Sequence, residues 1–111
     1  INYSLAEPAA ARRLLPLCEE RGVAVLVNRP FAKGQLFAAT KGRQLPPWAA
    51  DFGAQTWGQF FLQYVLAHPA VTCVIPATRK VEHLRDNLQA GHNAVPDKTQ
   101  QQAMADFIGS L

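Results

Sequence analysis

The chain has 111 residues, of which 49% are hydrophobic and 17% charged, and these values fit one globular domain rather than a disordered or two-domain chain. The formal net charge is +3, and the eleven Lys and Arg are scattered rather than gathered in a stripe, so we expect no nucleic-acid binding. No apolar run approaches the length of about 20 residues that a membrane span needs, so we expect no membrane insertion.

The N-terminal residues and the cysteines bear on the compartment. Ile1 to Ser4 show neither the basic nor the apolar region of a signal peptide. Cys18 and Cys73 lie in a helix-like and a strand-like segment, do not specify a disulfide, and are expected to be buried as small apolar side chains. We therefore expect a cytoplasmic protein.

A first helix is predicted to open at Glu7-Pro8, because proline suits the first helical turn. Pro16 is expected to kink it, since proline cannot donate back to Arg12. Gly22 is predicted to provide a left-handed C-cap. Three residues are predicted to share the inward face: Leu14, Leu17 and Cys18.

Two unbroken apolar runs, Val23 to Val27 and Val71 to Ile75, predict strands that are buried on both faces, as in a parallel sheet. Ile1 to Leu5 is a candidate third strand. The segment from Asn28 to Gln55 is rich in Gly and Pro and predicts a long loop with a short helix near Trp48. Loops of that length are usually functional.

A second helix is predicted to begin at Thr56, with Gln59 completing a capping box, and to stop before Pro69. An aromatic stripe at helical spacing predicts core packing: Trp57, Phe60, Phe61 and Tyr64.

Two further helices follow the second strand. The first presents one apolar face and is ended by Gly91. Its apolar residues are Val81, Leu84 and Leu88. Asp97 caps the last helix with Gln100 in the capping-box position. Its inward residues are Met104, Phe107, Ile108 and Leu111. The order predicts an α/β fold with about three parallel βα units and a C-terminal helix, joined by right-handed crossovers.

The sequence contains no motif that by itself indicates catalysis or metal binding. His68, His83 and His92 lack the spacing and the carboxylate companions of a metal site, so we expect no bound metal. The informative segment is Ile75 to Asn87, in which a buried strand ends in a turn bearing Thr78, Arg79 and Lys80 before a helix. A hydroxyl, two cations and a helix start favour a phosphate, although a solvated basic turn has the same pattern.

These motifs are similar to those of the aldo-keto reductases. The run "VIPATRKVEHLRDNLQAG" resembles the eighth strand, loop and helix of that family, "GVAVLVNRPFAKGQLF" its seventh strand and loop, and "INYSLAEP" the end of its sixth strand. Within the family the chain most resembles a bacterial branch with Asn-Arg-Pro-Phe after the seventh strand. The resemblance covers the chain in order and implies the C-terminal part of a (β/α)8 TIM barrel, with residues 1–111 forming one partial-barrel domain.

The resemblance implies a site for NADP(H). Thr78 and Arg79 would hold the adenosine 2′-phosphate with Lys80 nearby, and His83 stands where many members carry an Arg. Asp86 and Asn87 would meet the adenine edge. The seventh-strand loop would lie along the nicotinamide ribose and the pyrophosphate through Asn28, Arg29, Lys33, Gly34 and Leu36. Asn28 departs from the family, since an aromatic residue usually stacks on the nicotinamide there.

The resemblance also implies what is absent. The catalytic Asp, Tyr, Lys and His of the family lie on its first four strands, so no catalytic residue is expected here and the chain alone is expected to be inactive. Three readings stay open: an inactive reductase fragment with part of the cofactor site, a non-catalytic half-barrel that serves as an assembly module, and a piece of a complete enzyme. In each case we expect self-association or binding to the missing N-terminal half-barrel.

Overall fold

A computed structural model describes all of residues 1–111. Helices dominate the chain, and its elements follow in this order: η1 (Ala9–Ala11), α1 (Leu14–Glu20), β1 (Leu26–Val27), η2 (Ala32–Gly34), α2 (Gln35–Thr40), η3 (Pro47–Phe52), α3 (Trp57–Leu66), β2 (Cys73–Val74), α4 (Val81–Ala90) and α5 (Lys98–Gly109). The labels α and β mark α-helices and strands, and η marks 3-10 helices.

The sheet is parallel, as predicted, but small. β1 pairs with β2 in the register Leu26 with Cys73 and Val27 with Val74. The N-terminal segment joins β1 through a single parallel bridge between Asn2 and Asn28, so the third predicted strand is reduced to that bridge. Each predicted run of five apolar residues shortens to a strand of two, because each strand edge has at most one short partner.

The prediction that both strand faces are buried is wrong. Val25 and Val27 are buried, whereas Val23, Leu26 and Ile75 are each more than half exposed. Helices cover one face of the sheet, and no element covers the other. For the same reason Cys73, which was expected to be buried, is exposed.

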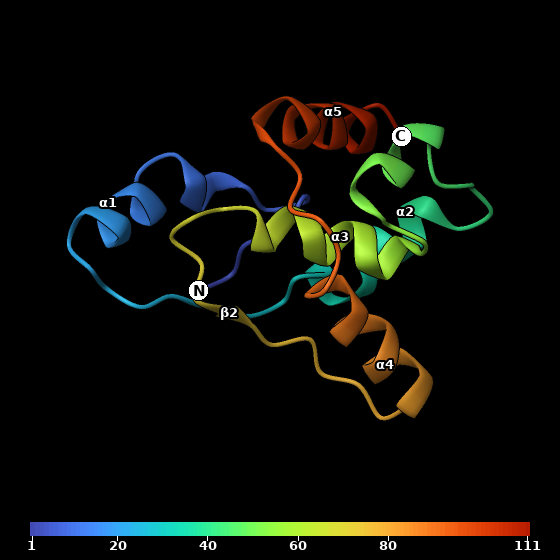
Figure 1. The fold of residues 1–111 in the computed structure, drawn as a ribbon, viewed down its shortest axis with the longest axis horizontal. Coiled ribbons are helices and arrows are strands. Elements are labelled where there is room, and N and C mark those ends of the chain that lie inside the picture. Colours follow the sequence, from blue (N-terminus) through green and yellow to red (C-terminus); the bar gives the residue numbers. More distant parts are fainter.

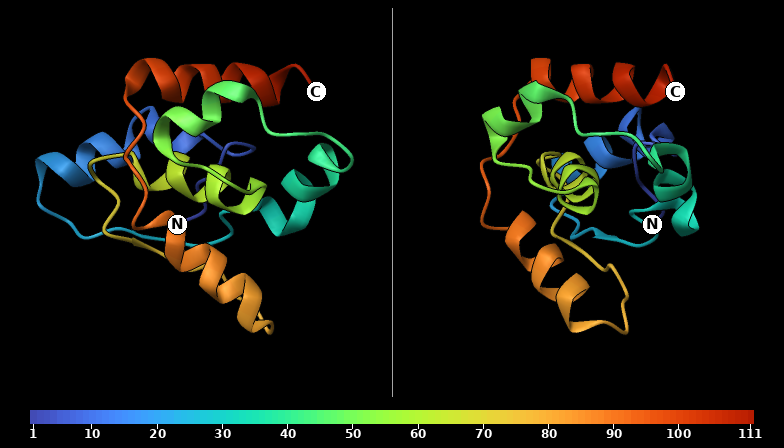
Figure 2. Two further views of the ribbon diagram at one scale, coloured as in Figure 1. Left: turned by 45° about the vertical axis from the view of Figure 1, so that its right-hand side comes forward. Right: turned by 90° about the vertical axis from the view of Figure 1, so that its right-hand side faces the viewer.

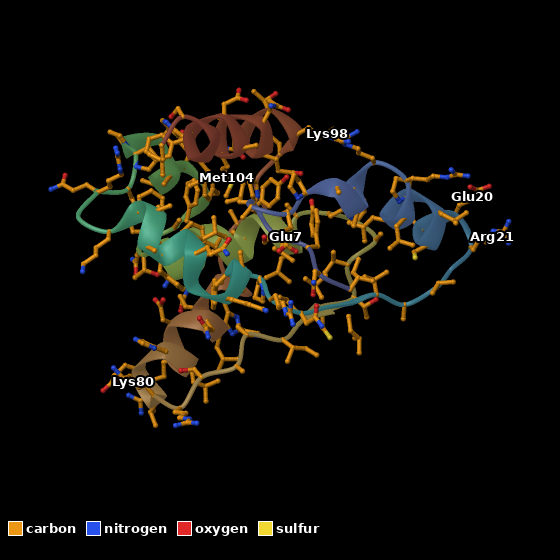
Figure 3. All side chains as sticks on the ribbon, turned by 180° about the vertical axis from the view of Figure 1, so that it is seen from behind. Glu7, Glu20, Arg21, Lys80, Lys98 and Met104 are labelled. Atoms are coloured by element: carbon orange, nitrogen blue, oxygen red, sulfur yellow. The ribbon has the colours of Figure 1, made fainter.

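The core gathers around α3, as the aromatic stripe predicts. Phe60 and Phe61 are fully buried, and both pack on Trp57 at ring-centroid distances of 5.2 and 5.7 Å. α3 runs through the centre of the molecule, with α5 on the far side of it from the sheet (Figure 1). Met104 of α5 is fully buried and points from that helix into the core (Figure 3).

The caps of α3 and α5 differ. The Asp97 side chain accepts from the backbone N–H of Gln100 and the Gln100 side chain accepts from that of Asp97, which confirms the predicted capping box of α5. Thr56 caps α3 by accepting from the Gln59 backbone N–H. Gln59 does not complete that box, because its side-chain oxygen accepts instead from the backbone N–H of Gln55.

The first helical segment is interrupted before Pro16. The chain leaves helical geometry at Arg13, with φ −140°, and α1 begins at Leu14. Pro16 therefore lies in the first turn of α1, where its missing N–H is harmless, and the break replaces the predicted kink. The predicted inward face is wrong for Leu14 and Leu17, which are exposed while Leu15 is fully buried, but Cys18 packs partly buried against the core as predicted. Gly22 has the predicted left-handed conformation, with φ +66°.

The segment from Asn28 to Gln55 contains more structure than its composition predicts. The short helix near Trp48 is confirmed as η3, but η2 and α2 were not predicted.

Helix α4 is more exposed than its apolar residues predict. Its apolar residues Val81, Leu84 and Leu88 share the predicted face, yet all three are exposed, because α4 packs on α3 through other residues.

Candidate cofactor site

A cavity of about 680 Å³ lies beyond the C-terminal ends of β1 and β2. This is the position where parallel α/β folds place ligands. Its lining comes from three segments: Phe31 and Phe37 after β1, Thr56, Trp57 and Gly58 at the start of α3, and Ala77, Thr78, Glu82, His83, Asp86 and Asn87 after β2 and on α4.

One wall of the cavity is aromatic. Phe31 and Phe37 contact each other with ring centroids 4.8 Å apart, and both lie close to Phe61 of α3. Trp57 is stacked between Phe61 and Phe107, and its indole N–H donates to the carbonyl of Arg43 at 2.9 Å. These contacts fix the rings, so the wall offers a preformed apolar surface on which an aromatic ligand ring can pack.

The opposite wall is polar. Thr78 Oγ1 accepts from the backbone N–H of Lys80 at 3.2 Å, which orders the turn before α4. α4 begins at Val81 with no side-chain cap on its first N–H groups. These free donors form the positive end of the helix dipole, which favours an anion. Arg79 and Lys80 are exposed and lie outside the cavity lining.

Asp86 joins the two walls. Its carboxylate accepts from Thr56 Oγ1 at 2.7 Å and from Gln59 Nε2 at 2.8 Å, so each of its oxygens has a partner on α3. The adjacent Asn87 also lines the cavity and is half-buried.

The segment after β1 is strained. Arg29, Ala32 and Lys33 have φ of 52°, 51° and 57°, a left-handed conformation that costs L-residues about 1–2 kcal/mol each. Gly34 follows with φ 85°, which glycine adopts freely. Strain of this kind concentrates at functional sites.

The structure brings together four of the residues implied by the resemblance and leaves the others apart. Thr78, His83, Asp86 and Asn87 line the cavity. The five residues of the segment after β1 and Arg79 do not line it: Asn28, Arg29, Lys33, Gly34, Leu36 and Arg79. Leu36 is buried in the core, and its carbonyl accepts from the Thr40 hydroxyl at 2.9 Å, while Asn28 donates its backbone N–H to the Ile1 carbonyl.

Sequence reasoning missed most of the aromatic wall. Phe37 lies in the segment that was predicted to be irregular, whereas Thr56, Trp57 and Gly58 lie at the start of the helix that was predicted to begin at Thr56. Nothing in their spacing links them to the turn at Thr78. Phe31 carried a signal, because it belongs to the Asn-Arg-Pro-Phe motif.

A second titratable cluster lies away from this cavity. Burial raises the pKa of Tyr3 well above its usual range, and the neighbouring Tyr64, stacked on it at 5.9 Å, raises it further. Burial lowers the pKa of His68, although Glu19 opposes this shift. None of the three lines the cavity, and they border a separate pocket of about 310 Å³.

No three His, Cys, Asp or Glu side chains gather as a metal site would require. No helix has the length and apolar character needed to cross a membrane.

The chain is similar to known oxidoreductases. It is 36% identical over 78 residues to an uncharacterized oxidoreductase of Schizosaccharomyces pombe, a match covering 70% of this chain and 24% of that protein. It is 27% identical over 113 residues to pyridoxal 4-dehydrogenase of Microbacterium luteolum, covering 87% of this chain and 33% of that protein. The chain thus spans about a quarter to a third of the length of these relatives.

A solved structure matches over a larger share of this chain. The holo form of an aldo-keto reductase from Bacillus halodurans aligns with a TM-score of 0.69 at 22% identity, over 96% of this chain and 40% of that one. This match confirms the predicted α/β fold with parallel strands as part of a reductase fold. Residues 1–107 match the aldo/keto reductase family, and the chain therefore belongs to that family.

Proposed function

We propose that the chain forms the adenosine part of the NADPH site of an aldo-keto reductase, an oxidoreductase that reduces carbonyl groups. The observation that carries this proposal is the cavity between a fixed aromatic wall and the uncapped start of α4. Its volume of about 680 Å³ lies within the usual range of cofactor sites. When bound, the nicotinamide would supply the hydride.

The residues present fit the adenosine 2′-phosphate. The Thr78 hydroxyl, the free N–H groups of α4 and the Arg79 guanidinium can donate to phosphate oxygens, with Lys80 nearby. Glu82 and Asp86 are carboxylates of the cavity lining and would repel a phosphate. We therefore expect the phosphate at the exposed end, near Arg79, and the adenine deeper, against the aromatic wall and Asn87. His83 would lie between the two.

The segment after β1 is proposed to follow the nicotinamide ribose and the pyrophosphate. Arg29 and Lys33 are exposed cations there, and the positive φ angles of this segment turn its backbone sharply. Asn28 and Gly34 would approach through a short side chain or the backbone, and the buried Leu36 would anchor the segment in the core rather than contact the cofactor.

The test of this proposal compares two cofactors by calorimetric titration. We expect the chain to bind NADPH more tightly than NADH, and Arg79→Ala to remove about tenfold to a hundredfold of that preference, the worth of one charge-assisted contact. Arg85→Ala is the matched control, since it removes the same charge from an exposed position of α4 outside the cavity. Equal affinity for both cofactors, or equal behaviour of the two variants, would refute the site.

Turnover is a separate expectation. The resemblance implies that the catalytic Asp, Tyr, Lys and His of the family belong to strands other than those of this chain, so we expect no NADPH-dependent aldehyde reduction by the chain alone. Saturable turnover in a preparation free of host reductases would contradict this expectation.

A second candidate function is assembly. The uncovered face of the sheet exposes Leu26 and Ile75, and one face of α4 exposes Val81, Leu84 and Leu88. A groove of about 300 Å³ between β2 and α4 is lined by apolar residues that include Leu62, Leu66, Leu84 and Leu88. Exposed apolar surface of this kind is typical of an association site. We propose that this surface, here called the open face, packs against the remaining strands and helices of a reductase barrel, with self-association when these are not supplied.

A further inference from the structure

The N-terminal half of helix α4 projects from the rest of the molecule, with the start of the helix outermost (Figures 1 and 2). Lys80, which precedes the helix, marks the tip of the projection (Figure 3). Residues 81–85 are all exposed, whereas residues 86 and 87 are half-buried and residue 90 is buried. Asp86 is thus the first residue of α4, counted from its N-terminus, that is partly buried.

Asp86 is held by a clasp of two hydrogen bonds. Thr56 Oγ1 donates to one carboxylate oxygen at 2.7 Å, and Gln59 Nε2 donates to the other at 2.8 Å. Both bonds have a charged acceptor, which makes them stronger than neutral ones.

The donors of the clasp are themselves fixed. Gln59 is buried, and its side-chain oxygen accepts from the backbone N–H of Gln55 at 3.0 Å and from Asn93 Nδ2 at 3.1 Å. Thr56 is tied to the backbone of α3 by the cap bond from Gln59. The amide of Gln59 therefore has one orientation, with its N–H toward Asp86.

The contact also depends on Gly58. A Cβ built on Gly58 would lie 3.1 Å from Asp86 Oδ2, closer than side chains normally approach. The absence of a side chain at this position lets the carboxylate reach both donors.

We infer that Asp86 is a positioning residue for the cofactor site, rather than a ligand of the adenine. This inference rests on the proposed function. The clasp fixes the projecting half of α4, which bears Glu82 and His83 and follows the turn at Thr78, at a set distance from the aromatic wall of Phe31, Phe37 and Trp57. Each carboxylate oxygen already accepts one hydrogen bond, from Thr56 or Gln59, and we assign recognition of the adenine edge to Asn87, which also lines the cavity.

An exchange of the two partners tests the inference. Gln59→Glu breaks the bond by setting two carboxylates against each other, and Asp86→Asn removes the charge of the acceptor and leaves one oxygen that can accept from only one of the two donors. We expect each variant to weaken NADP⁺ binding about tenfold, as loss of a charge-assisted hydrogen bond implies. The double variant Gln59→Glu/Asp86→Asn restores the bond with reversed polarity and unchanged total charge. We expect it to bind NADP⁺ about as tightly as the original chain.

The controls separate positioning from direct contact and from charge. Gln100→Glu adds the same charge on α5, keeps its capping acceptor and should leave binding unchanged. If Asp86 contacts the adenine directly, Asp86→Asn and the double variant bind equally weakly, which overturns the inference. Rescue in the double variant supports it, because a defect of either position alone would persist there.

Hydrogen exchange provides a readout that needs no cofactor. We expect each single variant to speed exchange of the backbone N–H groups of α4 more than those of α5, and the double variant to restore protection. This result supports the clasp even if NADP⁺ fails to bind, an outcome that would refute only the proposed function. Unchanged exchange in α4 of both single variants overturns the inference.

Discussion

Three residues without glycine's freedom hold positive φ angles directly after β1: Arg29, Ala32 and Lys33. Their strain is offset by local bonds, since Ala32 N–H donates to the Arg29 carbonyl and Gly34 N–H to that of Phe31, and by the burial of Ala32. A sequence predicts such strain poorly, because only Gly34 signals a left-handed turn. The resemblance, and not the residues alone, pointed to this segment.

His68 makes stability depend on pH. Its ring Nδ1 accepts from the backbone N–H of Ala70 at 3.1 Å, so the fold holds the neutral ring, in agreement with its lowered pKa. The unfolded chain binds a proton as pH falls through about 6.5, while the folded chain does so only at lower pH. We therefore expect the free energy of unfolding to fall as pH drops below about 6.5, until the folded-state pKa is reached.

Urea unfolding at a series of pH values measures this dependence. His68→Asn keeps a side-chain acceptor and does not titrate in this range, so the variant should lose the part of the slope that His68 contributes. An identical slope in both proteins would show that His68 is not responsible.

At the scale of the elements, caps and core stripes were predictable because they depend on neighbours in sequence. The Asp97 cap, the Thr56 start of α3 and the burial of Phe60 and Phe61 follow from local spacing. What covers an element does not follow from spacing. The period of α4 was predicted correctly, but its apolar face is exposed, because no other part of the chain packs on it.

The residues that line the cavity divide in the same way, into those that a local motif indicates and those that only the tertiary fold brings there. Thr78, His83 and Asn87 come from one continuous motif and were identified, whereas Trp57 reaches the cavity from a distant helix. Asp86 was assigned to the adenine from its place in the motif. Only the tertiary contact with Thr56 and Gln59 indicates another role.

The capping box of α5 supports a stability prediction. Replacing Asp97 with Ala removes the acceptor for the Gln100 backbone N–H, at 2.7 Å, and we expect a loss of about 1 kcal/mol. Thermal unfolding measures the loss as a lower Tm. Asp51→Ala, at an exposed position of η3, is the control and should change Tm little; equal losses in both variants would argue against the capping role.

At the scale of the whole molecule, the exposed area exceeds that of a self-sufficient domain. The accessible surface is 7015 Å² for a mass of 12.2 kDa. Folded monomers of that mass expose about 6,100 Å², so the excess is about 900 Å². One partner in a standard protein interface buries about 800 Å². The excess is thus close to the area that one partner buries, as the association proposed for the open face would require.

We expect the isolated chain to self-associate at micromolar concentration through the open face, and light scattering measures its mass. The double variant Leu84→Ser/Leu88→Ser should shift the measured mass toward that of the monomer, because both leucines lie in the open face. Val95→Ser, an exposed valine outside that face, should not. A monomeric original chain with low binding of hydrophobic dye would contradict the association.

The most direct test of the cofactor site maps NADP⁺ onto the chain by NMR of its backbone N–H groups. We expect shift changes at Thr78, His83 and Asn87 on one wall and at Phe31 and Trp57 on the other, since these residues line one cavity. The cluster of Tyr3, Tyr64 and His68 borders a different pocket and should stay unchanged. Changes confined to that cluster, or none at the cavity at saturating NADP⁺, would contradict the account.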